Sequence, residues 1–414
     1  MTDRLVIIAG RILDVVSGEV LVDRALVVED GRVTDVMPAA AAPPPASART
    51  IDLSGLTVVP GLIDSHSHLV GDVQEGGVPA TTTSAAQEAF IGVRNARATL
   101  RAGFTTVRDL GSFRAFVDCA LRDAIDAGDV EGPRMQCAGA YVTAPWGGGD
   151  VVGLAHDIVL PTDLRFGVVT SPDEVRDRVR RLLIGGADVI KCIATGAVLT
   201  RGGVPGAPEL TEAELRAAVE EAAHYGAFVA AHAHGAEGAK RAIRAGVRSV
   251  EHGSMLDDEA IGLLVDRGTY LVMDLYDGEW IAEVGLREGW PVETLRKNDE
   301  TMETAVVAFE KAVAAGVRLA FGTDSGVYPH GLNARQLAWY VRCGLPPLAA
   351  IRTATLWAAQ LMGWEDRVGS LQPGRWADLV AVPGDPLSDV TVLERPVVVL
   401  MGGRVVRDDR SAVG

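Results

Sequence analysis

Two histidines spaced two residues apart follow an apolar stretch in the first sixth of the chain. His66 and His68 stand in the run GLIDSHSHL, after the hydrophobic segment LTVV. Residues i and i+2 of a strand point to the same side, so both imidazoles would face the same space. Histidine is the commonest metal ligand, and such a pair could hold one divalent cation. By itself the HxH pattern is weak evidence for a metal site.

Three further segments end in residues that bind metals. FVAAHAHG carries His232 and His234, SVEHG carries His252, and LAFGTDSG carries Asp324. Five of the eight histidines therefore follow short apolar segments, which chance clustering explains poorly. Functional side chains of an α/β barrel gather at the carboxyl ends of its strands. The pattern predicts a metal centre assembled from several strand ends.

Lys191 ends another apolar segment, VIKCI. A charged lysine is costly to bury, so one interpretation is an ion pair with Asp188 or Asp324. The other interpretation is functional. A neutral amine can add carbon dioxide and become a carbamate, whose two oxygens can bridge two cations. The residues alone leave both interpretations open.

Short apolar segments alternate with helical patterns through the middle of the chain. Strands are predicted to end near His68, Asp109, Tyr141, Lys191, His234, His252, Tyr276 and Asp324. Ser171 and Thr211 each precede a glutamate by three residues, which predicts two capping boxes. Eight strand–helix units in about 300 residues favour an α/β fold of the (β/α)8 TIM-barrel type. The alternative, a doubly wound sheet, is weakened because no glycine-rich phosphate loop follows the first strand.

The two ends of the chain are rich in strand patterns and differ from this middle region. Apolar runs broken by Gly, Asp and Pro occupy the N-terminal part, and similar runs return near the C-terminus. We therefore expect residues 1–59 and 367–414 to form one small β-sandwich domain, and residues 60–366 to form the barrel.

Composition narrows the classes of partner and compartment. The chain has 414 residues and a formal net charge of −16, which argues against nucleic-acid binding because such binding needs a basic face. Its four cysteines form no CxxC pair, so they are expected to be reduced thiols. The sequence starts without a signal-peptide pattern, and no apolar run reaches about 18 residues. We expect a cytoplasmic protein with no membrane contact.

The order of these motifs resembles the binuclear-metal amidohydrolase superfamily over nearly the whole chain. Similarity is strongest to the prolidase-like dipeptidases, a group that includes ochratoxin-hydrolysing amidases and, more distantly, imidazolonepropionase and phenylurea hydrolases. The motifs that carry the resemblance are PGLIDSHSHL, LRAGFTTVRDLG, VIKCIATGAV, AHAHG, VEHG and GTDSGVYPHG. LVIIAGRILD and GSLQPGRWADLVAV resemble the composite β domain of that superfamily.

The resemblance implies a ligand set and a mechanism. It implies that His66, His68 and Asp324 hold a first divalent metal, that His232 and His252 hold a second, and that carboxylated Lys191 bridges them with a hydroxide. Zinc suits imidazole and carboxylate ligands, although ligand type does not exclude manganese, cobalt or iron. The hydroxide would attack an amide carbon. Asp324 would pass its proton to the leaving nitrogen.

Four residues are predicted to contact substrate. His234 shares the face of His232, and His330 follows the last predicted strand. Tyr276 lies in a loop made acidic by Asp274, Asp277 and Glu279. The acidic loop could bind an Arg or Lys side chain, although such loops are often simply solvated. The fourth residue is Trp146, in WGGGD, where prolidase-like relatives carry a GGHGD-like stretch with a histidine. This departure weakens the case for a dipeptide with a free carboxylate and favours a hydrophobic amide, carbamate or N-acyl amino acid.

Three functions remain in competition. The leading one is hydrolysis of an amide or peptide bond in a dipeptide or N-acyl amino acid, of the prolidase-like or Xaa-Arg/Lys type. The second is hydrolysis of aryl amides, carbamates or ureas. The third is an inactive scaffold or binding protein, which is disfavoured because no ligand position is empty. The expected partner is a small-molecule substrate, and the resemblance also implies a homo-oligomer.

Overall fold

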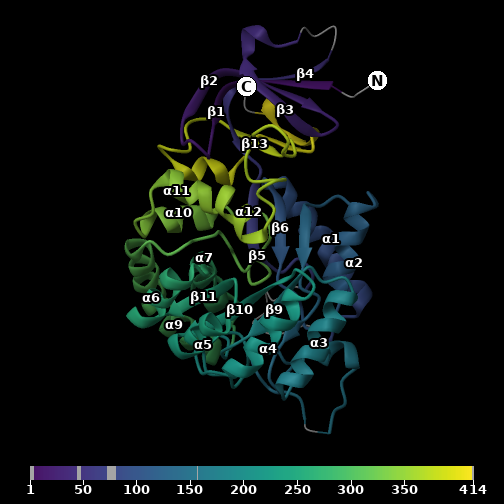
Figure 1. The fold of residues 1–414 in the computed structure, drawn as a ribbon, viewed down its shortest axis with the longest axis vertical. Coiled ribbons are helices and arrows are strands. Elements are labelled where there is room, and N and C mark those ends of the chain that lie inside the picture. The colour runs from purple at the N-terminus through teal and green to yellow at the C-terminus, as the bar shows by residue number, and fades with distance from the viewer. Residues whose placement is uncertain (1–3, 44–47, 72–80, 156, 413–414) are drawn as a thin grey trace.

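The structure is a computed structural model that describes residues 4–43, 48–71, 81–155 and 157–412. Figure 1 shows a sheet in which the purple N-terminal strands lie beside yellow C-terminal segments, above a larger body of helices and strands. The chain therefore brings its two ends together on one side of the molecule.

The terminal strands form one seven-stranded sheet in the order β15-β14-β13-β4-β1-β2-β3. β13 pairs antiparallel with β4, and β4 runs parallel to β1. All seven strands belong to one hydrogen-bonded sheet, so the predicted two-layer sandwich is not confirmed. The strands are β1 Arg4–Leu13, β2 Val20–Glu29, β3 Arg32–Pro38, β4 Arg49–Pro60, β13 Leu379–Val382, β14 Val398–Met401 and β15 Arg404–Asp408.

Local chemistry explains why the first strands pair as they do. β2 and β3 are joined at Asp30 and Gly31, which have φ angles of 50° and 77°. Two successive positive φ angles match the twist of a tight hairpin, and Asp-Gly is a preferred sequence for it. Leu5, Ile7 and Leu26 then face a core that also contains residues of β4, β13 and β14. Residues from both chain ends therefore share one hydrophobic cluster.

Parallel strands form the interior of the larger body. One ladder has the order β5-β6-β7 and the other β12-β11-β10-β9-β8. The segment 318–325 contacts both: the Leu271 N–H donates to Arg318 O, and the Ser65 N–H donates to Phe321 O. The strands are β5 Leu62–Ser67, β6 Phe104–Asp109, β7 Arg134–Cys137, β8 Tyr141–Val142, β9 Val189–Ile193, β10 Phe228–Gly235, β11 Ser249–Met255 and β12 Tyr270–Val272.

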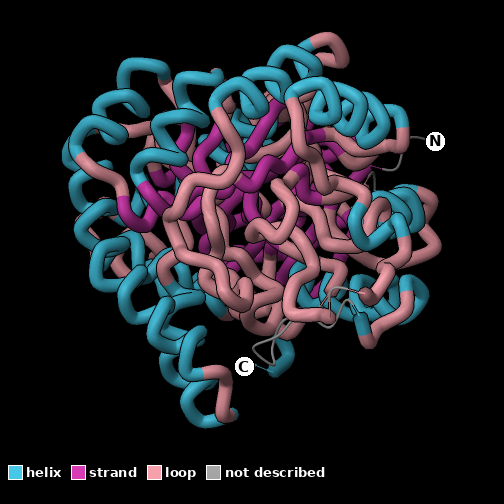
Figure 2. The backbone as a smooth tube through the Cα atoms, turned by 90° about the horizontal axis from the view of Figure 1, so that it is seen from below, coloured by secondary structure: helices cyan, strands magenta, loops and turns pink. Residues whose placement is uncertain are grey.

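Helices surround these strands, and loops cross the face seen in Figure 2. The longer helices are α1 Ala85–Arg101, α2 Val117–Asp126, α3 Pro172–Ile184, α4 Glu212–Ala223, α5 Ala236–Ala245, α6 Asp258–Arg267, α9 Val292–Ala315, α10 Arg335–Arg342, α11 Pro347–Thr353 and α12 Leu356–Met362. Shorter turns are η1 Ala39–Ala41, η4 Thr162–Arg165, α7 Tyr276–Trp280, η5 Ile281–Gly285, α8 Leu286–Glu288, η6 Val390–Glu394 and η7 Arg410–Ala412. The fold is α/β, with parallel strands inside and helices outside.

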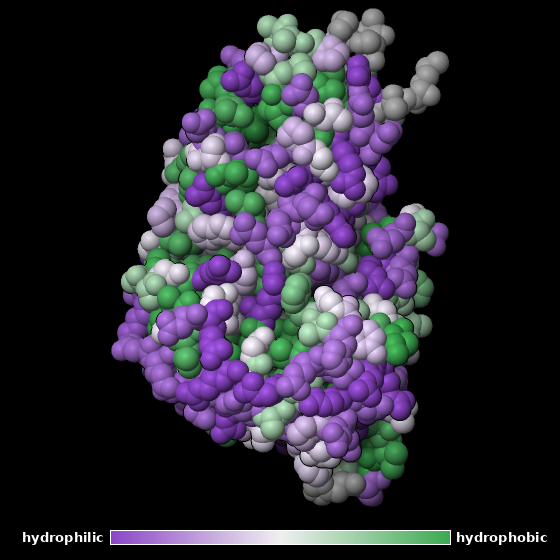
Figure 3. Space-filling model, in the orientation of Figure 1, coloured by the Kyte–Doolittle hydropathy of each residue, from purple (hydrophilic) through white to green (hydrophobic). Residues whose placement is uncertain are grey.

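The face of the molecule drawn in Figure 3 carries many hydrophilic residues with apolar groups between them. This surface is consistent with the strong excess of acidic over basic residues. Within the described ranges, none of the helices combines the length and the apolar character that a membrane span requires.

A buried ion pair joins the terminal sheet to the barrel. Arg134, which begins β7, donates from Nε and Nη2 to the two carboxylate oxygens of Asp378, at 2.9 and 3.2 Å. Only 4% of the Asp378 side chain is exposed, and it also accepts the Gly402 N–H. The Arg134 guanidinium lies 4.2 Å from the centre of the Trp376 ring. Removing the arginine would leave a buried carboxylate without its counter-charge.

We predict that Arg134→Ala lowers the free energy of unfolding by about 2–3 kcal/mol, because breaking a buried pair strands its partner. Denaturant unfolding measures the change. The matched control is Arg4→Ala, which removes an arginine from an exposed pair with Glu29. That change should alter stability by less than about 1 kcal/mol. Equal effects of the two substitutions would contradict a structural role for the Arg134–Asp378 pair.

Candidate metal centre

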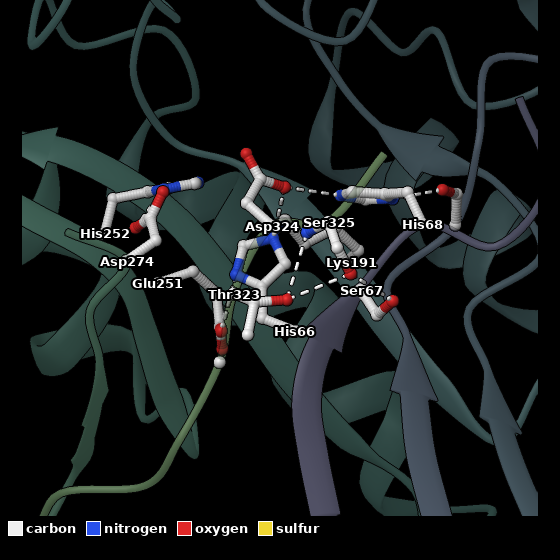
Figure 4. A network of polar contacts seen from close by, with 12 residues as sticks. His66, Ser67, His68, Lys191, Glu251, His252, Asp274, Thr323, Asp324 and Ser325 are labelled. Carbon is white, nitrogen blue, oxygen red and sulfur yellow. Dashed lines mark hydrogen bonds and ion pairs between the residues drawn. The ribbon is translucent and has the colours of Figure 1, made fainter. Parts of the chain in front are cut away.

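The six predicted metal ligands come from four strands and from the segment 318–325, to which no strand is assigned, and they meet inside the barrel. His66 lies near the end of β5 and His68 directly follows that strand. Lys191 lies in β9, His232 in β10 and His252 in β11. Asp324 lies in the segment that pairs with β5, because its N–H donates to His66 O. Figure 4 shows His66, His68, Lys191, His252 and Asp324 directed toward a common centre, and His232 packs against His252 there. The structure therefore brings together residues that are up to 258 positions apart, as between His66 and Asp324.

The first group of ligands surrounds one oxygen of Asp324. His68 Nε2 lies 3.0 Å from Asp324 Oδ1, and His66 Nε2 lies 3.3 Å from the same atom. Lys191 Nζ lies 3.3 Å from His66 Nε2. A single cation could contact both histidines and the carboxylate, since their ligand atoms already converge.

The second group consists of three packed imidazoles. The ring centre of His232 lies 4.4 Å from that of His252 and 4.7 Å from that of His234. The ligand atoms of these three residues all lie within 4.8 Å of one another. His66 and His252 have ring centres 4.9 Å apart, so the two groups adjoin. The arrangement offers neighbouring positions for two cations.

Acceptors behind the rings orient three of the histidines. His252 Nδ1 lies 2.8 Å from Asp274 Oδ1, His66 Nδ1 lies 3.1 Å from Glu251 Oε2, and His68 Nδ1 lies 2.7 Å from Gly111 O. A proton held at Nδ1 leaves the Nε2 lone pair directed at the centre. Metal-binding histidines usually have such a partner on the other ring nitrogen. The donor set and its orientation therefore fit a divalent metal.

Glu251 and Arg108 are part of the site that the sequence motifs did not identify. Arg108 Nη2 donates to Glu251 Oε1 at 2.8 Å, and both side chains are almost fully buried. Burial would raise the pKa of Glu251, but Arg108 and His66 hold it well below its ordinary value. A charged residue inside an apolar strand, as in SVEHG and TTVRD, was the available signal. The carboxylate therefore stays ionised beside the His66 ring.

Two ligands have strained backbones. His252 has a φ angle of 70° and Asp324 a φ angle of 52°. Residues with a Cβ atom rarely adopt this left-handed region, and such residues cluster at functional sites. Both therefore owe their position to the surrounding structure.

Lys191 is fully buried and has no carboxylate partner at Asp188. Asp188 instead accepts a hydrogen bond from Arg122 Nη1 at 2.7 Å, so the predicted pair with Asp188 is wrong. That aspartate precedes β9 and lies at the opposite end of the strand from the centre. Burial lowers the pKa of the Lys191 amine to about 8, although Glu251 and Asp324 oppose the shift. The neutral form that carbon dioxide requires is thus accessible near neutral pH.

A cavity of about 1370 Å³, counting the space at its mouth, lies over this centre. Besides the metal-binding side chains, its wall includes a set of apolar residues: Val70, Ile91, Phe113, Ile193, Val198, Leu199, Ile281, Met302 and Val327. Its composition suits a ligand with a substantial apolar part.

The four predicted substrate contacts divide into one that lines the cavity and three that do not. His234 lines it, and its Nδ1 lies 3.0 Å from Ser254 Oγ. Tyr276 is buried, and its hydroxyl accepts a hydrogen bond from Arg335. His330 donates from Nε2 to His68 O at 3.1 Å, which supports the ligand strand. Trp146 is 72% exposed. Tyr276, His330 and Trp146 are not among the residues that line the cavity. Their predicted contact with substrate is not confirmed.

The acidic loop does not act as one cluster. Asp274 binds His252, and Glu279 accepts a hydrogen bond from Trp339 Nε1 at 2.6 Å, outside the cavity wall. Asp277 also lines the cavity wall, but it binds neither a histidine nor a tryptophan. Burial and the carboxylates of Asp274 and Asp324 raise the pKa of Asp277 well above its ordinary value.

The profile of the amidohydrolase family matches residues 57–406. The chain belongs to this family. It is 32% identical over 405 residues to ochratoxinase from Aspergillus niger, across 92% of this chain and 82% of that protein. The resemblance that the sequence motifs carry is therefore confirmed.

Solved structures agree with this assignment. A Xaa-Pro dipeptidase with methionine bound in its active site is 37% identical, covers 97% of this chain and 99% of its own, and superposes with a TM-score of 0.90. Phenylurea hydrolase B is 23% identical, covers 99% of this chain and 97% of its own, and has a TM-score of 0.81, which shows a shared fold. The predicted TIM-barrel type of fold is confirmed by these amidohydrolase structures.

We predict that Asp274→Asn weakens zinc binding about 10- to 100-fold, because His252 loses the acceptor that orients it. Titration of the metal-free protein with zinc measures the affinity. Asp258→Asn on the exposed start of α6 is the matched control and should leave affinity unchanged. Unchanged zinc affinity in Asp274→Asn would show that the carboxylate does not orient the ligand.

Proposed function

We propose that this family member is a metal-dependent hydrolase of amide or peptide C–N bonds, acting on dipeptides or N-acyl amino acids with apolar side chains. One observation supports the proposal: the four candidate ligand histidines, Lys191 and Asp324 all line one largely apolar cavity. The buried acceptors behind the imidazoles support a metal-binding role for them.

The residues divide between two metal positions in this proposal. His66, His68 and Asp324 hold the first ion, which the short distances to Asp324 Oδ1 support. His232 and His252 hold the second, which their ring contact supports. Lys191 lies next to His66 and, as a carbamate formed with carbon dioxide, would supply two further oxygen ligands. Zinc is the metal we expect.

Bound divalent ions would acidify a water molecule and polarise the substrate carbonyl. Asp324 accepts the proton of the attacking water and transfers it to the leaving nitrogen. Burial would raise the pKa of Asp324, but His66 and His68 lower it well below its ordinary value. The group is therefore ionised in the metal-free protein. The hydrogen bond between His330 and His68 O keeps the adjoining ligand strand in position.

The cavity wall supports apolar substrates more than cationic ones. Val70, Phe113 and Ile281 are among its lining residues, whereas Glu279 of the acidic loop is engaged elsewhere. Gly148 of the WGGGD stretch lines the wall, and its N–H contacts Glu209. An aliphatic or aromatic side chain would bury apolar area there. Three of the carboxyl residues on the wall, Glu88, Asp274 and Asp324, already have partners of their own.

A second function, hydrolysis of aryl amides, carbamates or ureas, draws support from the same apolar wall. The fold shared with phenylurea hydrolase B is compatible with it. An inactive scaffold has no observation in its favour, since each of the six expected ligand positions carries a residue able to bind a metal.

We predict that the zinc-loaded protein, prepared with bicarbonate, releases amino acids from dipeptides and N-acyl amino acids that carry apolar side chains. The measurement is amino-acid release from dipeptides pooled by C-terminal residue, beside N-acyl amino acids. Release from the Arg and Lys pools should be weaker, because Glu88, Asp274 and Asp324 on the wall already have partners. No release from any pool, with both metals confirmed bound, would move the search to aryl amides, carbamates and ureas.

We predict that Asp324→Asn lowers kcat by about 10²- to 10⁴-fold, the usual contribution of a positioned acid–base group. Steady-state kinetics and metal analysis of the same preparation measure the effect. Asp266→Asn, which removes an exposed carboxylate from α6, should retain full activity. An Asp324→Asn protein with both metals and normal turnover would contradict the proton-transfer role.

A further inference from the structure

A glycine-rich segment between β9 and α4 forms part of the cavity wall. Residues 197–200 of this segment, AVLT, line the cavity. The next residues, RGGVPG, contain three glycines, and the Val204 side chain among them is 64% exposed. Gly202 and Gly206 have φ angles of 73° and 86°. Glycine loses much conformational freedom when it is ordered, so contacts from other elements must hold the segment in position.

The helix α9 provides two of these contacts. Lys297 Nζ donates to Thr200 O, and the Gly202 N–H donates to Glu293 Oε1, both at 2.9 Å. The same Glu293 oxygen lies 2.5 Å from Lys297 Nζ, so the two side chains hold each other. A third contact comes from Thr200 Oγ1, which donates to Gly148 O at 3.0 Å. The peptide groups on both sides of position 201 are therefore bound to α9.

Lys297 is the unusual member of this arrangement. It is only 2% exposed, and a buried ammonium group is unfavourable unless acceptors surround it. An apolar side chain would avoid this cost. The acceptors are the Glu293 carboxylate and the Thr200 carbonyl oxygen. Lys297 itself does not line the cavity, and the proposed metal chemistry does not use it. Its contacts point to a role in holding the segment.

The segment carries one side of an apolar pocket within the cavity. Leu199 packs against a cluster of Ile281, Trp290 and Val327. Of these four residues, Leu199, Ile281 and Val327 line the cavity and form what we call the Leu199 pocket. Ile281 lies in η5, and Val327 lies in a turn closed by its own N–H, which donates to Asp324 O. Leu199 is therefore the side of the pocket whose position depends on the glycine-rich segment.

We propose that Leu199 sets the size of the apolar substrate group that the Leu199 pocket accepts, and that Lys297 is the positioning residue that keeps Leu199 there. The inference rests on the proposed hydrolase function and deepens it, since it assigns the choice of apolar group to one segment. Lys297 acts through the backbone of this segment and takes no part in bond cleavage.

The first test is Lys297→Met, which keeps an unbranched chain and removes the ammonium group. When a smaller fraction of molecules holds the segment in place, apparent affinity falls by that fraction. KM for Leu-Phe should rise about 10-fold, the worth of a charged hydrogen bond, while kcat stays within about threefold. KM for Ala-Ala should change less than about threefold, because methyl groups bury little area in the pocket. Steady-state kinetics of the zinc-loaded protein measure both.

Lys311→Met is the matched control variant. It removes a lysine from the same helix, but Lys311 is half exposed and pairs with Asp258 at the surface. This variant should keep the wild-type KM for both dipeptides, and metal analysis should show equal occupancy in all proteins. Equal rises in KM for Leu-Phe and Ala-Ala in Lys297→Met would indicate a general structural role. A fall in kcat without a change in KM would also contradict the positioning role.

The second test is Leu199→Ala, which enlarges the pocket. Dipeptides with 2-naphthylalanine in place of the Leu or of the Phe of Leu-Phe vary the size of each side chain separately. The ratio of kcat/KM for the naphthyl compound to that for Leu-Phe should rise about 10-fold at one of the two positions, the usual discrimination of an apolar pocket. An unchanged ratio at both positions would overturn the role of Leu199.

Two measurements keep the inference independent of the proposed reaction. Arg201 is exposed, and trypsin cuts after it only when the local chain leaves its bound position. Release of the fragment that begins at Gly202, followed by mass spectrometry, should be about 10-fold faster in Lys297→Met than in Lys311→Met, which also lacks one lysine. Equal rates would overturn the positioning role, whether or not any dipeptide is cleaved.

Calorimetry with 4-methylpentanamide tests the pocket in the same way. This compound carries a branched apolar group beside an uncharged amide. Leu199→Ala should weaken its binding to the zinc-loaded protein about 10-fold, because the variant removes apolar contact area. Unchanged binding would overturn the pocket. If the wild-type protein cleaves no dipeptide, the proposed function fails, while the trypsin and calorimetry results still decide this inference.

Discussion

The histidines at the centre of this barrel depend on hydrogen-bond acceptors buried behind them. An imidazole can present Nε2 to a cation only when its ring is fixed and its proton stays on Nδ1. Asp274 and Gly111 O provide this for His252 and His68, and the Glu251 carboxylate lies 3.1 Å from His66 Nδ1. Each acceptor needs its own support, because an isolated charge is unfavourable in an apolar interior. Arg108 supplies it for Glu251.

A buried carboxylate that needs hydrogen-bond donors also links β5 to the segment 318–325. Asp64, two residues before His66, accepts hydrogen bonds from Thr323 Oγ1 at 2.6 Å and Asn333 Nδ2 at 2.8 Å. Burial raises the pKa of Asp64 to about 6, and these two hydrogen bonds oppose the rise. The contacts fix the segment that carries Asp324 against β5. The strained φ angles of His252 and Asp324 are maintained by such surroundings.

Predictions from the sequence were most accurate for features that depend on neighbouring residues, such as helix caps. Thr211 forms the predicted capping box with Glu214 in both directions. At Ser171 only half of the predicted box is present, since the Glu174 carboxylate instead accepts the Thr170 N–H. Strand ends were equally readable, because a polar residue after an apolar run is unusual. Tyr276, Trp146 and His330 were harder to place, because their orientation depends on loops and on partners distant in sequence.

The sequence by itself determined the family, the alternation of strands and helices, and the six residues that meet at the centre. It did so because metal ligands are chemically distinctive and strand ends of a barrel must converge. Only the tertiary structure decided which carboxylates stand behind the histidines and that Asp188 pairs with Arg122 rather than Lys191. It also decided that Asp277 lies on the cavity wall whereas Glu279 of the same loop binds Trp339 outside it. These outcomes depend on which long-range neighbours fill each buried hydrogen-bonding position, and spacing along a chain does not contain that information.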